Sequence, residues 1–154
     1  LTGRTAGSLS FAAIAGIAVG LPVSMWVGGG FPMTAPDVWF GEWSWAPTSV
    51  SEAEAGYSIA FGELDVDLRH LDLTQSTTIP LGANFGQLDV IIPDDVRVEA
   101  NINYGMGSID WLGHETGGLF THSQTYDNGV IAHRNDPVLY LDIRVAAGET
   151  NVSY

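Results

Sequence analysis

The side chains most suited to chemistry in this 154-residue chain are acids that recur within a five-residue phrase. The phrase has glycine, any residue, an apolar residue (threonine in the last copy), Asp or Asn, and an apolar residue; it stands at 62–66, 86–90, 107–111 and 148–152. Stacked in register, the copies would place Asp65, Asp89 and Asp110 in an outward column, continued by Asn151, at the ~4.8 Å spacing of neighbouring strands.

Such a column could act in two ways. Like charges this close repel, so the pKa values of the carboxyls would rise or a cation would lie between them. A calcium ion takes roughly six to eight oxygen ligands, which is more than one column supplies. We therefore favour a solvated acidic face that discourages edge pairing, and we expect no metal and no other cofactor.

The other reactive residues form no recognisable catalytic set. The serines stand in no Gly-x-Ser-x-Gly elbow, and there is no cysteine to serve as a thiol nucleophile. His114, His122 and His133 are eight and eleven residues apart, which matches no common metal-ligand spacing. With 18 acids, five arginines and a net charge of −13, the chain also lacks the basic footprint of a nucleic-acid binder. We expect neither enzymatic activity nor a small-molecule substrate.

The repeated phrase predicts the fold that positions these acids. Its glycines are Gly62, Gly86, Gly107 and Gly148, with a degenerate fifth at Gly129, and they recur every 19 to 24 residues. A period near 20 residues with strand-type alternation is typical of stacked β coils. We predict an all-β domain over 55–154: a short single-stranded β-helix or solenoid of about five coils. In each coil glycine turns the corner, and alternate apolar residues fill a narrow core.

The residues before this domain predict a membrane anchor. No charge occurs between Arg4 and Asp37, and the apolar stretch 8–31 is long enough to cross a bilayer as one transmembrane helix. A cleaved signal peptide and a buried core helix are the alternatives. Residues 1–7 form its flank, and the tryptophan-rich residues 32–54 are interpreted as a juxtamembrane linker, with the tryptophans at the membrane surface or beneath the first coil. The lone arginine favours a cytoplasmic N-terminus and an extracytoplasmic C-terminal domain in the cell membrane.

One face of the predicted transmembrane helix could associate with another helix. Ala12, Gly16 and Gly20 fall four residues apart, and small residues at this spacing let a second helix approach closely. Small residues are also common in membrane spans for reasons of composition alone, so both interpretations stay open.

Three stretches resemble a known domain family. Residues 56–68, 85–98 and 104–110 are similar, in order and spacing, to the C-terminal domain of LiaF-like and actinobacterial PspC-like membrane proteins. This resemblance implies a short β-helix-like domain outside the membrane, tethered to one or more spans, in a regulator of cell-envelope stress. It implies no catalytic residues. The PspC segment that usually precedes this domain is not visible in the sequence.

We therefore expect a non-enzymatic, membrane-anchored envelope protein whose solenoid binds a membrane protein partner or assembles as a homo-oligomer. The chain ends at Tyr154, two residues after Val152, so the last coil would present an open edge for pairing. The alternative is an architectural accessory subunit of a larger membrane complex, held by the small-residue face of the helix. A third hypothesis is a cation- or glycan-binding surface formed by the acidic column.

Overall fold

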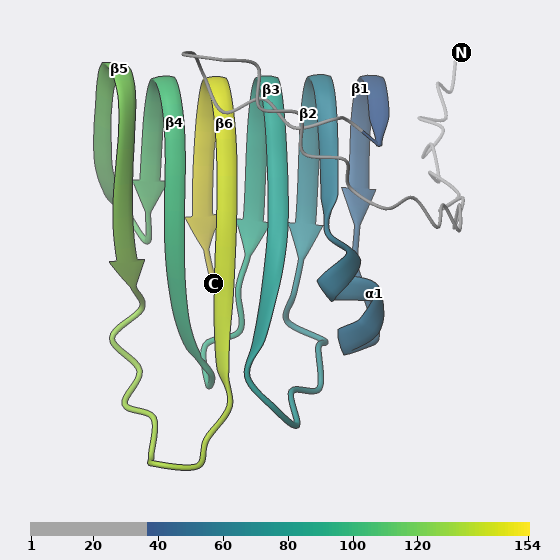
Figure 1. Ribbon diagram of the computed structural model, residues 1–154, viewed down its shortest axis with the longest axis vertical. Coiled ribbons are helices and arrows are strands. Elements are labelled where there is room, and N and C mark those ends of the chain that lie inside the picture. The colour runs from purple at the N-terminus through teal and green to yellow at the C-terminus, as the bar shows by residue number, and fades with distance from the viewer. Residues whose placement is uncertain (1–36) are drawn as a thin grey trace, which may run out of the picture.

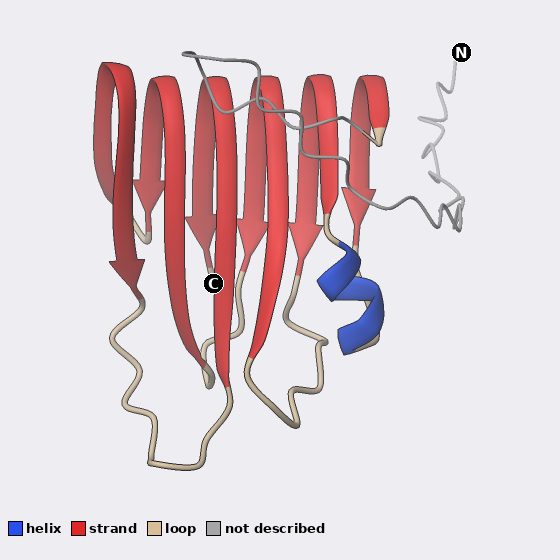
Figure 2. Ribbon diagram, in the orientation of Figure 1, coloured by secondary structure: helices blue, strands red, loops and turns tan. Residues whose placement is uncertain are grey.

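The described part of the protein is almost entirely β-structure (Figure 2). The computed structural model describes residues 37–154, apart from the side chains of residues 120–122. The expected transmembrane helix at 8–31, with Ala12, Gly16 and Gly20, lies outside that range. Within it, no helix has the length and apolar character needed to span a bilayer. The all-β prediction is confirmed for the described residues.

The strands belong to one sheet. In chain order the elements are β1 (Val38–Trp45), α1 (Val50–Ala55), β2 (Tyr57–Asp67), β3 (Thr77–Ile91), β4 (Arg97–Trp111), β5 (His114–Asp127) and β6 (Val138–Ser153). The order across the sheet is β1-β2-β3-β6-β4-β5. Neighbouring strands run parallel except for β4 and β5, which are antiparallel.

Each long strand is folded over near its middle. In Figure 1 the strands rise, turn at one common edge and descend, so the sheet doubles back on itself in two layers. Strands β3, β4 and β6 contain 15, 15 and 16 residues. The strand–glycine–strand unit predicted from the sequence is therefore one continuous strand, bent where glycine permits it.

The hydrophobic core lies between the two layers. The rising halves contribute side chains such as Ile59, Leu81 and Ile143, and the descending halves contribute Leu64 and Leu88; all five are at most 2% exposed. Burying each such side chain stabilises the fold by about 2 kcal/mol. Because side chains alternate along a strand, the residues between these positions face outward on the descending halves.

The stacking order departs from the predicted solenoid. A solenoid places successive repeats side by side, but β6 lies between β3 and β4 (Figure 1). Strand β5 returns antiparallel because Leu112 (φ 52°) and Gly113 (φ 83°) close a tight two-residue hairpin. The hairpin thus adds a strand, His114–Asp127, that carries no copy of the glycine phrase. Tyr154 follows a central strand, so the expected open edge at the C-terminus is wrong.

The folded domain also begins before the boundary predicted at residue 55. Strand β1 pairs with β2 along its length, and Trp45 stacks on Tyr57 with ring centroids 5.5 Å apart. Helix α1 follows, capped by Ser49, whose Oγ accepts a hydrogen bond from the backbone N–H of Glu52 at 3.3 Å. Much of the expected linker 32–54 is thus folded structure. In the described residues β1 and β5 are the two outer strands of the sheet.

Candidate functional site

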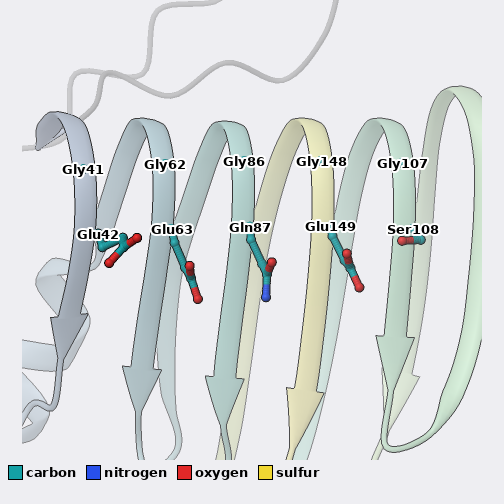
Figure 3. Close-up of a pocket in the computed structure, with 10 residues that line it drawn as sticks. All are labelled: Gly41, Glu42, Gly62, Glu63, Gly86, Gln87, Gly107, Ser108, Gly148 and Glu149. Carbon is teal, nitrogen blue, oxygen red and sulfur yellow. The ribbon is translucent and has the colours of Figure 1, made fainter.

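A line of glycines crosses the folded edge of the sheet. Gly41, Gly62, Gly86, Gly148 and Gly107 lie opposite one another in register. Their φ angles run from 123° to 151°, and a Cβ on any of the last four would overlap the carbonyl oxygen of the neighbouring glycine. Glycine is therefore required both for the bend and for the close approach of the backbones. We call this line, with the row of side chains on either side of it, the glycine ridge (Figure 3).

The ridge contains four of the five glycines predicted as corners. Gly129 is the exception: it lies in the loop between β5 and β6 with φ 77°, and no other atom would come within 4 Å of its Cβ. The degenerate copy of the phrase is therefore not a repeat, which corrects the expectation. Sequence reasoning also misses Gly41, although residues 41–45 keep the phrase with Ser44 at the position of the acid.

An apolar row runs along one side of the glycines, at the residue before each of them. In spatial order it comprises Phe40, Phe61, Phe85, Ala147 and Met106. Leu119 of β5, which lies opposite Met106, extends the row by one residue. Phe40 is 70% exposed and Phe61 is 42% exposed. The three phenylalanine rings stack, with successive centroids 5.4 and 5.0 Å apart. Sequence reasoning misses this row; its signal is an apolar residue directly before a phrase glycine.

An acidic row runs along the other side, at the residue after each glycine. In spatial order it comprises Glu42, Glu63, Gln87, Glu149 and Ser108, which project from the descending halves of the strands (Figure 3). These side chains and the five glycines line an open trough of about 750 Å³. The floor of the trough is bare glycine backbone, so an occupant can approach the peptide groups closely.

The predicted acidic column forms a second row, two residues further along each strand. Asp65 lies opposite Asp89, Asp89 opposite Asn151, and Asn151 opposite Asp110. The register matches the expected column, but the insertion of β6 places Asn151 inside the column and not at its end. Asp110 also has a structural role, because its Oδ1 accepts a hydrogen bond from the backbone N–H of Gly113 at 2.8 Å.

Three carboxylates converge where the two rows meet on β2 and β3. One oxygen each from Glu63, Asp65 and Asp89 lies within 4.8 Å of the others. Gln87 donates from Nε2 to Asp89 Oδ2 at 2.7 Å, whereas Asp89 Oδ1 is buried without a hydrogen-bond partner. Burial, and then repulsion by Asp89 and Glu42, raises the pKa of Asp65. Burial, and then repulsion by the neighbouring acids, likewise raises the pKa of Glu63.

The side chains of His114 and His133 do not join this cluster. His114 and His122 belong to β5, and His133 lies in the loop that follows it. Within residues 37–154, the side chains of 120–122 aside, the metal-ligating side chains that gather are those of the acid cluster. With one oxygen from each residue the cluster offers three ligands, fewer than the roughly six to eight oxygens that a calcium ion takes.

The raised pKa values of Glu63 and Asp65 predict that the free energy of unfolding rises on mild acidification. Because the pKa values of Glu63 and Asp65 are raised above their ordinary 4.5 and 3.8, the folded state binds protons more tightly than the unfolded state. The free energy of unfolding is therefore expected to fall as pH rises from about 4 through the raised pKa values. Differential scanning calorimetry at pH 7.5 and pH 5 measures the effect, expected at about 2 °C in Tm because both groups are solvent-screened.

A double replacement isolates these two carboxyls from every other titrating group. In Glu63→Gln/Asp65→Asn the gain in Tm between pH 7.5 and pH 5 should be smaller than in the wild type. The control is Glu54→Gln, an exposed acid on α1, which should keep the wild-type gain. An equal gain in Tm in the wild type and in the double variant would show that protonation of Glu63 and Asp65 does not change the free energy of unfolding.

Comparison with known proteins gives one family match. Residues 39–152, which include the whole glycine ridge, match the family described as cell wall-active antibiotics response LiaF, C-terminal. A search of functionally characterised proteins finds no match. A crystal structure of a candidate cell adhesion protein from Clostridium sporogenes ATCC 15579 is similar at 16% identity and a TM-score of 0.48, over 64% of this chain and 53% of that one. This chain thus spans about half the length of that structure. Because the family match extends over well more than half of its residues, the chain belongs to the LiaF-like family and carries that family's C-terminal domain.

Proposed function

We propose that this protein is a non-enzymatic regulator of the cell-envelope stress response and that the glycine ridge is where it docks a protein partner. In this proposal residues 8–31 anchor the chain in the membrane with the N-terminus in the cytoplasm, and the folded sheet is presented outside. The family, whose description names the response to cell wall-active antibiotics, supports this setting. The resemblance to actinobacterial PspC-like proteins points to the same kind of signalling.

The observation that carries the proposal is the apolar row of the ridge. Contiguous exposed apolar strips are uncommon on soluble domains and mark places where partners bind. The core has its own complete set of buried side chains between the layers, whereas Phe40, Met106 and Leu119 are 70%, 41% and 67% exposed. The row is held on a backbone locked by glycine-to-glycine contact, so little conformational entropy is lost when a partner binds.

The acids of the ridge suit recognition better than catalysis. They lie on an open face and repeat at the strand spacing, whereas acid–base catalysis uses two groups whose environments differ. Charged rows beside an apolar strip instead steer a partner of opposite charge and fix its register. The proposal therefore assigns the acids to the partner interface.

The position of β1 at the edge of the sheet formed by residues 37–154 favours a second function, that of an architectural subunit. β1 is an outer strand, and its Trp39 and Trp43 are 65% and 41% exposed. An outer strand can add a strand from a second copy or from another protein through its unpaired backbone groups. Purification in mild detergent separates the two functions: stoichiometric recovery within a larger complex favours the architectural role, and release of the partner on dilution favours the regulator.

Replacing Phe61 and Phe85 together by serine is expected to abolish regulation without unfolding the domain. The rings are 42% and 40% exposed, so each change should cost about 1 kcal/mol or less, well below the cost of a core truncation. The measurement is an envelope-stress promoter reporter in a host strain that lacks its own copy of the gene and is complemented with wild type or variant. The variant should behave like the uncomplemented strain.

The matched control is Ile131→Ser, because Ile131 is 83% exposed in the loop before β6 and lies away from the ridge. It should restore the wild-type response at equal protein level, judged by immunoblot. A wild-type response from the ridge variant argues against docking at the ridge. A reporter that does not respond to deletion of the gene argues against the regulatory role itself.

A further inference from the structure

In the described part of the chain, the acids of the ridge form no ion pair with an arginine. The ion pairs among the described residues join Arg69 to Asp67, Arg97 to Glu99 and Asp127, and Arg144 to Asp142. None of these acids belongs to the acidic row beside the glycines or to the acidic column two residues further along each strand. The rows contain Glu42, Glu63, Glu149, Asp65, Asp89 and Asp110. Within residues 37–154, the ridge is thus a strip of negative charge whose acids form no ion pair.

A positive charge supplied by a partner would reduce the repulsion between the carboxylates of this strip. Three carboxylates already lie within 4.8 Å of one another, and Asp89 Oδ1 is buried without a hydrogen-bond donor. The pKa of Asp65 is raised by burial and by the neighbouring acids, which means that its ionised form is disfavoured there. An ammonium or guanidinium group placed in the row would supply positive charge and hydrogen-bond donors to the accessible oxygens of these carboxylates.

The apolar row sets the second requirement for an occupant. It runs parallel to the acidic row on the other side of the glycines, and it crosses β1, β2, β3, β6 and β4. Five strands with four gaps of ~4.8 Å give a strip about 19 Å long. An extended segment of about six residues, or a helix of about 13, covers that length. The occupant must therefore be elongated, apolar along one side and basic along the other.

We propose that the glycine ridge binds a basic, amphipathic polypeptide segment of a partner protein. The Lys or Arg side chains of this segment lie on the acidic row, and its apolar side chains lie on the apolar row. This inference rests on the proposed docking function and adds the chemistry of the partner. A second copy of this chain fits poorly, because it would bring another acidic ridge against the first. Anionic lipid and nucleic acid are excluded by the same charge argument.

The test measures binding of a defined probe to the full 154-residue chain in zwitterionic detergent. The probe is a fluorescein-labelled peptide of about 14 leucines and lysines patterned as an amphipathic helix, followed by fluorescence anisotropy. Replacing Glu42, Glu63 and Glu149 together by glutamine should weaken binding about tenfold, and Phe61→Ser/Phe85→Ser should weaken it to a similar extent. Binding to the micelle is common to all variants and cancels in the comparison.

A second triple variant separates the ridge from net charge. Glu54→Gln/Asp72→Asn/Asp94→Asn changes the charge equally at exposed positions away from the ridge, and should weaken binding by less than about twofold. Equal losses from both triple variants overturn the inference, and so does a ridge-dependent dimer in analytical ultracentrifugation. One outcome separates the two proposals: Phe61→Ser/Phe85→Ser abolishes the reporter response, but the two triple variants bind the peptide equally well. In that case docking at the ridge is supported and the basic partner is rejected. If the peptide binds as expected while the reporter ignores the ridge, the regulatory proposal is rejected instead.

Discussion

The alanine variant of Gly86 is expected to lose about 4 kcal/mol of stability or more, a large part of the roughly 5–15 kcal/mol by which a typical domain is stable. Two costs add at this position. Gly86 has φ 137°, a conformation that L side chains rarely adopt, and its new Cβ would overlap the carbonyl oxygen of Gly62 on the neighbouring strand. Neither atom can move aside, because the carbonyl belongs to a backbone paired on both sides.

Gly113→Ala is the matched control, because it shares the positive φ but not the contact. Gly113 has φ 83° in the hairpin between β4 and β5, and its Cβ would meet no atom within 4 Å. The backbone conformation alone should cost about 1 kcal/mol. Urea unfolding followed by tryptophan fluorescence compares the two variants. Similar losses in both would mean that the ridge needs glycine for its bend alone and not for close strand contact.

The glycine phrase allows the local structure to be predicted because its glycine marks the bend and its alternating residues mark the core side of the strand. A position that demands positive φ and close backbone approach accepts only glycine, and the alternation that follows fixes which side chains enter the core. Leu64 and Leu88 are buried as that alternation requires, and Asp65 lies opposite Asp89 as the common register requires. Both features depend on residues within one copy of the phrase and its neighbour.

The order of the strands could not be predicted from the same phrase. Any copy can pair with any other in glycine-to-glycine register, so the pairing energies are nearly equal and do not specify neighbours. Gly148 pairs with both Gly86 and Gly107, which puts the last copy between the second and third. The hairpin at Leu112 and Gly113, which turns β5 away, lacks the Asn-Gly signal that marks such turns.

The apolar half of the site could not be predicted for a related reason. The two-residue alternation that assigns faces holds only while the backbone stays in the ordinary β region. At the bend the alternation fails: the pairing register skips Ala60, Gly62 has φ 129°, and Phe61, which would be assigned to an interior position by counting, is 42% exposed. The acids after the glycine could be assigned because counting restarts there. The sequence therefore indicates the charged side of the ridge and conceals the apolar side.

A chain that ends at residue 137, and so lacks β6, is expected to lose cooperative folding altogether. A sequential solenoid tolerates loss of its last repeat, because each repeat contacts only its neighbours and the rest stay stacked. Here β6 pairs with β3 on one side and β4 on the other. It contributes five large buried apolar side chains: Leu139, Leu141, Ile143, Val145 and Val152. At about 2 kcal/mol each they supply about 10 kcal/mol, as much as the whole stability of a typical domain.

Far- and near-ultraviolet circular dichroism during heating measures this, with a chain ending at Ser153 as the control. That control removes only Tyr154, which is 51% exposed and donates one hydrogen bond from its hydroxyl to the carbonyl of Asn128 at 3.1 Å, so it should melt within a few degrees of the wild type. A cooperative transition in the chain ending at 137 would mean that β3 and β4 can close on each other through Gly86 and Gly107. The sequential stack would then be an accessible alternative, and β6 a strand inserted into a sheet already formed. Loss of the transition makes β6 the strand on which the two halves of the sheet, and the continuous ridge across them, depend.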